Sequence, residues 1–184
     1  TITYVNNTTS TITAAPVTIS GLSASNKTYD ASQTATLTGT PTAAGVLAGD
    51  TVTVSGSATA GSFASANVAS GIAVTPTLSG LTLSNSNYYI NGVTSALTAN
   101  ITAAPVSVDG LIADNKTYDR TRVATISGTP TPNGVLGSDS VVIVGSATTG
   151  TFASQNVATS IVVTADLSGL TLSNSNYYIN GVTS

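Results

Sequence analysis

The chain consists of two similar halves. Residues 12–95 align with residues 101–184 at a constant offset of 89 residues, without insertion or deletion, and about two-thirds of the aligned pairs are identical. A period of this length is too long for a one-helix or one-hairpin solenoid unit and is typical of a small domain. The sequence therefore predicts a tandem array of domains, an arrangement that usually supplies length and spacing rather than one active site.

Composition argues against several classes of function. Only 6% of the residues are charged, the net charge is −3, and the chain contains no His and no Cys. The chain therefore lacks the basic stripe that nucleic acid requires, and no apolar run approaches the ~18 residues needed to insert into a bilayer. Without His or Cys, the usual general bases and nucleophiles are missing. We therefore expect no enzymatic activity and no cofactor.

Apolar and polar residues alternate along short segments, as in β-strands with one buried face. The alternation is clearest at residues 51–55 and 71–75, and further candidate strands are residues 17–19, 35–37, 81–83, 88–90 and 97–101. Turn-forming residues separate these segments at intervals of about 8–12 residues, the spacing of a sandwich or barrel. Asn91-Gly92 predicts a type I′ hairpin turn after residues 88–90, and Asn180-Gly181 repeats it.

These patterns predict an all-β fold, with two tandem sandwich-like β domains in an elongated array and about seven to nine strands in each domain. A β-grasp-like or otherwise mixed repeat is the alternative. Pro16 and Pro105 mark the repeat starts, because Pro suits the first residue of an edge strand. Residues 1–13 then form the tail of a preceding repeat, residues 14–102 the first repeat, and residues 103–184 a second repeat without its last strand. The short link at residues 102–105 is not rich in Gly or Ser, which predicts a stiff junction.

Several short elements occur in both halves in the same order. They are residues 26–30, 49–56, 61–63, 67–69, 78–81 and 87–88, with counterparts at residues 115–119, Asp139, Phe152, Asn156 and Tyr177. In order and spacing these elements resemble YDG-type repeats, which occur in tandem in very large bacterial surface adhesins, often of the filamentous-haemagglutinin type. The resemblance covers both halves. It implies an extracellular, all-β stalk module without an agreed ligand and without catalytic residues.

The chain departs from the family pattern at one position. The Gly that names the motif is replaced by Ala31 in the first repeat and by Arg120 in the second. A position that accepts Arg does not strictly require a backbone conformation open only to Gly. We therefore expect the turn after Asp30 to differ from the usual form of the family.

The Lys-Thr-Tyr-Asp motif is the sharpest local signal, because the only two lysines of the chain lie in it at equivalent positions. In one interpretation the Tyr packs inward, while the Lys pairs with an Asp and lays its stem over apolar surface. The candidate motif residues are Lys27, Tyr29, Asp30 and Asp50 in the first repeat and Lys116, Tyr118, Asp119 and Asp139 in the second. An isopeptide bond from Lys27 to an Asn or Asp is the alternative. It requires a buried, deprotonated lysine and Asp50 as the proton shuttle.

Two further sites are candidates for ligand binding. Calcium requires several convergent carboxylates, and Asp109, Asp114 and Asp119 recur at intervals of five in the second repeat, with Asp139 as a fourth acid. A solvated acidic face, partly balanced by two arginines, is the alternative. The second candidate is formed by the adjacent tyrosines Tyr88-Tyr89 and Tyr177-Tyr178, since in a strand one ring of each pair faces inward and the other outward. The outward ring either stacks on a sugar or covers a small edge of the core.

Pattern and resemblance together favour a structural stalk or spacer that projects a distal binding region from the bacterial cell surface. One alternative is a weak glycan- or matrix-binding module whose tandem copies gain avidity. Another is a repeat that self-associates by strand addition and builds a filament or biofilm, in which residues 1–13 complete the last repeat of another copy. The expected partners are thus neighbouring repeats, other copies of the chain, or a glycan or matrix ligand.

Overall fold

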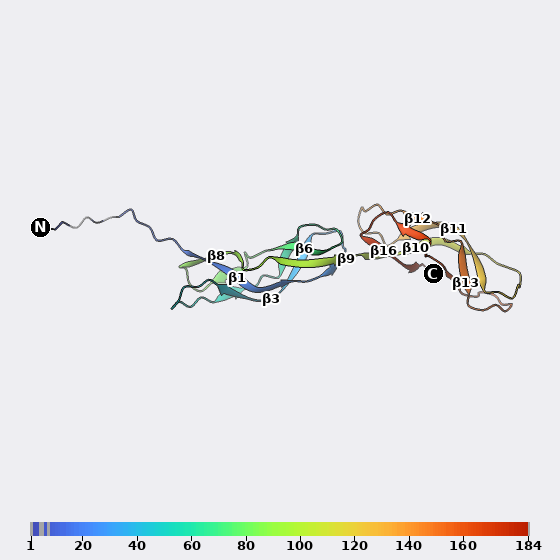
Figure 1. Ribbon diagram of the computed structural model, residues 1–184, viewed down its shortest axis with the longest axis horizontal. Helices are drawn as coiled ribbons and strands as arrows, with labels where there is room; N and C mark the ends of the chain where they lie inside the picture. Colours follow the sequence, from blue (N-terminus) through green and yellow to red (C-terminus); the bar gives the residue numbers. More distant parts are fainter. Residues whose placement is uncertain (1, 4–5, 7, 184) are drawn as a thin grey trace. The chain divides into compact units, whose positions relative to one another are not determined.

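All regular elements in the computed structural model are β-strands, and the model describes residues 2–3, 6 and 8–183 (Figure 1). The first repeat contains β1 (Ala15–Ala24), β2 (Lys27–Thr28), β3 (Thr34–Ala44), β4 (Val54–Gly56), β5 (Ala60–Phe63), β6 (Ala69–Pro76), β7 (Leu81–Leu83), β8 (Tyr88–Val93) and β9 (Leu97–Thr102). The second contains β10 (Ala104–Ala113), β11 (Val123–Asn133), β12 (Ile143–Gly145), β13 (Thr149–Phe152), β14 (Val163–Ala165), β15 (Leu170–Leu172) and β16 (Tyr177–Val182). The predicted all-β class with two tandem domains is confirmed.

Each repeat has one large sheet and one two-stranded sheet. In the first repeat the large sheet has the order β2-β9-β6-β5-β3-β1-β8, and β4 pairs with β7. In the second repeat the order is β14-β13-β11-β10-β16, and β12 pairs with β15. Seven strands correspond between the repeats, whereas β2 and β9 have no counterpart among the described residues of the second repeat. Among all described residues of the chain, none forms a helix with the length and apolar character needed to cross a membrane.

The first strand of each repeat pairs in parallel with a late one. β1 pairs with β8, where Val17 lies opposite Ile90 but Ile19 lies opposite Val93, so that β8 bulges between these positions. Gly92 lies in the bulge with a φ of 109°. The predicted hairpin turn at Asn91-Gly92 is therefore wrong. Gly92 of this dipeptide has the positive φ that such a turn would need, but it lies within a continuous strand. Because β1 pairs with residues on both sides of the dipeptide, the extra residue forms a β-bulge and not a turn. The counterpart at Asn180-Gly181 lies inside β16 in the same way.

Residues of the strands and of the loops between them build a small core in each repeat. In the first repeat, Ile19, Leu22, Ala58 and Leu81 form a buried cluster, against which Leu97 of β9 packs. The corresponding cluster in the second repeat contains Val108, Ala147 and Leu170. Burying a side chain of the size of Val or Leu stabilises a fold by about 1.5–3 kcal/mol, so these residues contribute to a core that also includes the fully buried Phe63 and Val106.

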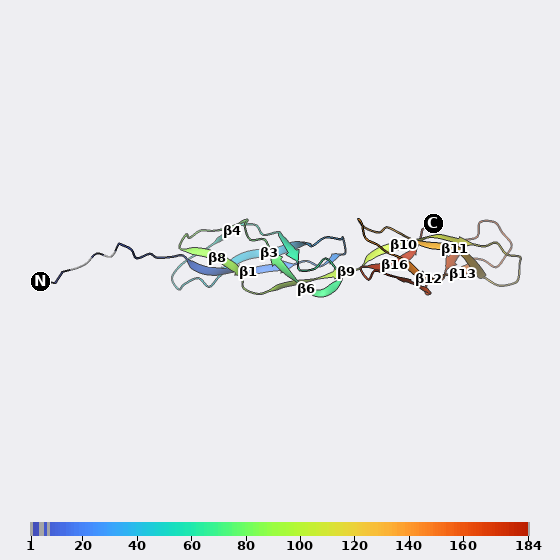
Figure 2. The same cartoon turned by 90° about the horizontal axis from the view of Figure 1, so that it is seen from above.

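The chain divides into two compact units whose limits differ from those of the repeats. The first unit contains Thr1–Ser25, Gln33–Ser65 and Gly71–Ala99, and the second contains Asn26–Ser32, Ala66–Ser70 and Asn100–Ser184. The strands β6 and β9, labelled in Figure 2, run from one unit into the other. The second unit thus includes two loops of the first repeat, one of which contains the Lys-Thr-Tyr-Asp motif. Of the predicted N-terminal tail, residues 1, 4, 5 and 7 lie outside the described residues.

Candidate functional site

The tyrosine of the first motif is buried within the second unit, where it bonds to a carboxylate of the second repeat. Its backbone is fixed first, because β2 pairs in parallel with β9 and the Tyr29 N–H donates to the carbonyl oxygen of Thr102 at 2.8 Å. The phenol then donates to Oδ2 of Asp139 at 2.8 Å, and the same oxygen accepts a hydrogen bond from Tyr177 at 2.6 Å. The two rings meet edge to face, with centroids 5.4 Å apart. We call Tyr29, Asp139 and Tyr177 the tyrosine–aspartate cluster.

The hydrogen bonds of this cluster favour an ionised Asp139 and two neutral tyrosines. Hydrogen bonds from Tyr177 and Tyr29 hold the pKa of the Asp139 carboxyl below its usual value. In return, the bond to Asp139 raises the pKa of Tyr29, while burial and then the same carboxylate raise the pKa of Tyr177. Asp139 is therefore ionised and both phenols are neutral around pH 7. In this state both hydroxyls can donate, and bonds to an ionised acceptor are about twice as strong as neutral ones.

A second contact joins the loop Ala66–Ser70 to the second repeat. The Val68 N–H donates to Oδ1 of Asn176 at 2.9 Å, and Nδ2 of Asn176 donates to Oδ1 of Asn67 at 3.1 Å. Asn176 is buried, and its own N–H is held by Oδ1 of Asn174 at 3.0 Å. We did not predict this amide pair as a site. The available signal was that both asparagines recur in the other repeat, as Asn156 and Asn87, within the short elements that the two repeats share.

In the first repeat, the equivalent aspartate accepts a hydrogen bond from one described tyrosine and not from two. Tyr88 donates to Oδ2 of Asp50 at 2.6 Å, and its oxygen accepts the N–H of Leu47 at 3.3 Å. The bond to Asp50 raises the pKa of Tyr88. No second tyrosine bonds to Asp50 within the described residues. Asp50 is exposed, whereas Asp139 is half-buried.

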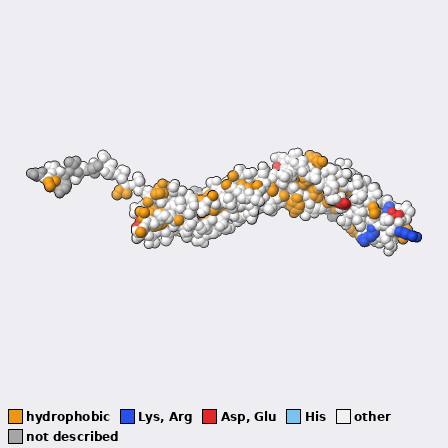
Figure 3. All heavy atoms as spheres, viewed as in Figure 1, with side chains coloured by type: hydrophobic (Ala, Val, Ile, Leu, Met, Phe, Trp, Pro, Cys, Tyr) orange, Lys and Arg blue, Asp and Glu red, His pale blue; other side chains and the backbone are white. Residues whose placement is uncertain are grey.

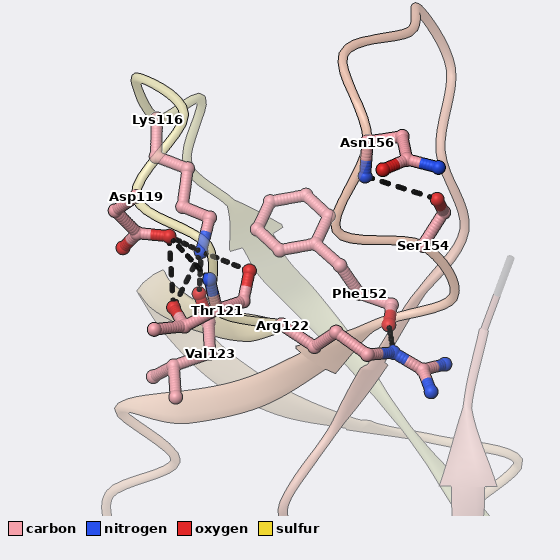
Figure 4. A network of polar contacts seen from close by, with 8 residues as sticks. All are labelled: Lys116, Asp119, Thr121, Arg122, Val123, Phe152, Ser154 and Asn156. Carbon is pink, nitrogen blue, oxygen red and sulfur yellow. Dashed lines mark hydrogen bonds and ion pairs between the residues drawn. The ribbon is translucent and has the colours of Figure 1, made fainter.

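Each motif lysine bonds to the turn that follows it in the chain. Nζ of Lys116 donates to Oδ1 of Asp119 at 2.9 Å and to the carbonyl oxygens of Thr121 and Val123 at 2.8 and 2.9 Å (Figure 4). It also lies 5.4 Å from the centre of the Phe152 ring. The ammonium group therefore closes the turn between the motif and β11.

The first motif closes its turn in the same way. Nζ of Lys27 lies 2.6 Å from Oδ1 of Asp30 and donates to the carbonyl oxygen of Ser32 at 2.8 Å. Asp50, which the isopeptide alternative requires as the proton shuttle, bonds to Tyr88. The structure thus brings Lys27 together with Asp30, and it places Asp50 in a different pair.

The turn after each motif aspartate adopts the backbone conformation that favours Gly. Ala31 has a φ of 60° and Arg120 a φ of 62°. The position therefore accepts a residue with a Cβ, as the sequence indicated, but the backbone stays in the left-handed region, and a difference from the usual turn of the family stays a prediction. Oδ1 of Asp119 accepts the N–H of Thr121 at 2.9 Å, and Oδ1 of Asp30 accepts that of Ser32 at 2.9 Å. These bonds hold the turn although the left-handed region costs a residue with a Cβ about 1–2 kcal/mol.

Restoring the missing glycine should stabilise the fold. We expect Arg120→Gly to raise the free energy of unfolding by roughly 0.5–1 kcal/mol, because it removes the strain and loses only part of that gain to the greater freedom of Gly in the unfolded chain. Chemical denaturation measures the difference. Ala113→Gly in β10 is the matched control, and it should lower stability by a similar amount. A loss of stability in both variants would mean that the turn stores no strain.

Acid should weaken the same turn. Hydrogen bonds from Lys116 and then Thr121 lower the pKa of Asp119 from 3.8 to about 2. A carboxyl with a depressed folded-state pKa stabilises the fold above about pH 4, and this contribution is lost as the pH falls towards 2. We expect the denaturation midpoint of the native chain to fall more steeply across this window than that of Asp119→Asn. Equal slopes would show that the Asp119 bonds add nothing to stability.

The candidate ligands for calcium do not converge. Oδ1 of Asp109 accepts the N–H of Gly110 at 2.7 Å, and Oδ1 of Asp114 accepts the hydroxyl of Ser127 at 2.6 Å. Asp119 bonds to Lys116 instead. Among the described residues, no three acidic, His or Cys side chains come together as metal ligands.

The tyrosine pairs are divided between core and surface. Tyr88 and Tyr177 are buried, whereas Tyr89 and Tyr178 are each 48% exposed. In the first repeat, Tyr89 borders an open groove of about 520 Å³, whose other walls include Leu78, Leu81 and Ile90. Of the four paired tyrosines, Tyr89 and Tyr178 therefore present an aromatic ring to solvent.

The fold and the tyrosine–aspartate cluster define a tandem-repeat protein in which signature residues of one repeat bond to the next. The YDG domain matches residues 13–96 and again residues 102–184. The chain therefore belongs to the YDG domain family and contains two copies in tandem. Neither the curated proteins nor the solved structures gave a match to the chain.

Proposed function

We propose that the two repeats are spacer modules in the stalk of an extracellular bacterial adhesin. The main support is the parallel pairing of β1 with β8 and of β10 with β16. Tension applied at the start of β1 and just after the end of β8 pulls these two strands in opposite directions along the strand axis. Because the strands are parallel, their evenly spaced hydrogen bonds are loaded together in shear and are not broken one after another.

Surface chemistry and the use of the motif residues also support a stalk. Most of the face in Figure 3 is uncharged, with few acidic or basic patches, as expected for a chain in which 6% of residues are charged. The polar signature residues Tyr29 and Asn176 form contacts within the second unit. They thus connect parts of the fold, and the resemblance to adhesin repeats implies a stalk module.

Single-molecule pulling tests the mechanical role directly. The chain has no Cys, so introduced cysteines can serve as unique handles. Handles at Ala14→Cys and Ser95→Cys load β1 and β8 in shear, whereas Ala14→Cys with Ser86→Cys pulls the same ends of both strands and unzips them. All three positions are exposed. We expect the shear pair to rupture at a force several-fold higher. Equal forces in the two geometries would contradict a spacer that resists tension.

A second candidate function is weak glycan binding, which the groove beside Tyr89 favours. Aromatic rings that are half exposed can stack on a sugar face, and two copies in tandem would add avidity. In that case immobilised glycans would retain the native chain but not Tyr89→Ala, with Tyr178→Ala weakening retention to a similar extent. A spacer would pass through unretained.

A further inference from the structure

Two exposed apolar side chains lie next to each other at β12 of the second repeat. Val142 and Val144 are each 55% exposed, whereas Ile143 between them packs against the core cluster of the second repeat. The equivalent residues of the first repeat are Thr53 and Ser55, which are also exposed. These two positions therefore lie on the surface in both repeats, but the second repeat has apolar side chains there.

The strand β12 also has a free edge. It lies at the margin of the second repeat in Figure 2 and belongs to a two-stranded sheet with β15, so that no described strand pairs with its other side. The Ser173 N–H donates to the carbonyl oxygen of Val142 at 2.9 Å, so the backbone of Val142 is directed toward β15. Because backbone groups alternate in direction along a strand, the N–H and C=O of Ile143 point to the free edge. This edge therefore presents a donor and an acceptor beside two exposed valines.

The sequence around this edge lacks the residues that usually keep strands of different copies apart. Proteins often protect a free edge with charged side chains or Pro, but residues 140–165 contain neither. Residues 141–144 are instead an uninterrupted run of Val and Ile, the residues that favour strands most. A short uncharged segment of this kind is typical of strands that pair with copies of themselves.

We propose that β12 pairs with β12 of a second copy of the chain, in antiparallel orientation and centred on Ile143. In this register the two Ile143 residues exchange their N–H···O bonds, and Val142 of each copy lies opposite Val144 of the other. The segment Val-Ile-Val reads the same in both directions, so the pairing is self-complementary. The four valines then lie on one face of the joined strands and cover one another, and no like charges oppose the contact.

This contact uses the same surface of both copies and is therefore closed by a two-fold axis. It produces a dimer and not a filament, because Thr53 and Ser55 give the first repeat no equivalent apolar pair. A short strand and four valines bury little surface, so the association is weak. The inference goes beyond the spacer function, which requires no association of copies. A monomeric protein that still resists shear would overturn this inference and leave the proposed function standing.

Sedimentation velocity across a concentration series, up to about 1 mM, tests the contact. We expect the average mass to rise from the 18.0 kDa of one chain toward twice that value and no further. Val142→Thr with Val144→Ser introduces the residues of the first repeat and should weaken the dimer at least about tenfold, a difference of about 1.4 kcal/mol. Ile112→Ser with Val123→Thr is the matched control, because it also replaces two exposed apolar residues by their first-repeat counterparts, but in β10 and β11. A native chain that stays monomeric, equal effects of the two double variants, or growth beyond dimers would overturn the proposal.

Cysteine cross-linking tests the register and the orientation of the strands. The chain has no Cys, so an introduced thiol is unique. Residues directly opposite each other in antiparallel strands have Cα atoms about 4.5–5.5 Å apart, within reach of a disulfide, whereas diagonal neighbours at about 7–8 Å lie beyond it. Under mild oxidation, a mixture of Val142→Cys and Val144→Cys should therefore form disulfide-linked dimers, while each variant alone should not. Linking of either variant with itself at a similar yield, or no linking in the mixture, would overturn the proposal.

Discussion

Gly39→Ala is expected to destabilise the first repeat by about 3 kcal/mol or more. Gly39 lies where the pairing of β1 with β3 shifts register, next to Gly21. Its φ is 103°, and a Cβ there would lie 2.0 Å from the carbonyl oxygen of Gly21. The substitution therefore combines the cost of about 1–2 kcal/mol for a left-handed residue with about 1–3 kcal/mol for forcing packed atoms apart. Chemical denaturation, followed by far-ultraviolet circular dichroism, measures the loss.

A matched control separates backbone strain from steric conflict. Gly71 also has a positive φ, of 65°, but a Cβ there would meet nothing within 4 Å. Its counterpart in the second repeat is Ser160, with a φ of 56°. Gly71→Ser should therefore cost only about 1 kcal/mol. If Gly39→Ala costs no more than this control, β1 and β3 can move apart without cost, and the close contact between the two glycines does not require the absence of a Cβ.

The fold class could be predicted from the sequence, because alternation of apolar and polar residues is a local property. Residues 81–83 and 88–90, for example, lie in strands as predicted. The partner of each strand could not be predicted. Asn91-Gly92 predicts a local turn, yet β8 pairs with β1, which is distant in sequence. Pairing over such distances depends on packing of the whole domain, which no short window of sequence contains.

The candidate site could be predicted only in part for the same reason. The motif residues were recognisable because they recur in both repeats, and the turn between Lys27 and Asp30 is local. The bond from Tyr29 to Asp139 is not local, since it joins residues 110 positions apart. A search within one repeat would have matched Tyr29 with Asp50. Because each repeat contains its own copy of the aspartate, the sequence does not show that a motif bonds to the aspartate of the following repeat.

Asp139→Ala is expected to lower the free energy of unfolding of the second unit by about 2–4 kcal/mol. The substitution removes the acceptor of two tyrosine hydroxyls, Tyr29 and Tyr177, and an unsatisfied buried hydroxyl costs about 1–3 kcal/mol. Asp50→Ala is the matched control, because Asp50 is exposed and accepts from Tyr88 alone among the described side chains. We expect the control to cost about 1 kcal/mol. Equal losses would mean that the Tyr29 bond does not stabilise the protein.

A double-mutant cycle can isolate the bond that involves the first motif. Tyr29→Phe should destabilise the native chain but have little effect in the Asp139→Ala background, since the acceptor is already gone. Hydrogen exchange of Asn26–Ser32 provides an independent measurement, because this loop belongs to the second unit. Either variant should speed exchange there while the core of the first repeat, around Ile19, stays protected. Exchange that rises equally in both regions would instead indicate a general loss of stability, and the motif would then not act as a specific connection to the second repeat.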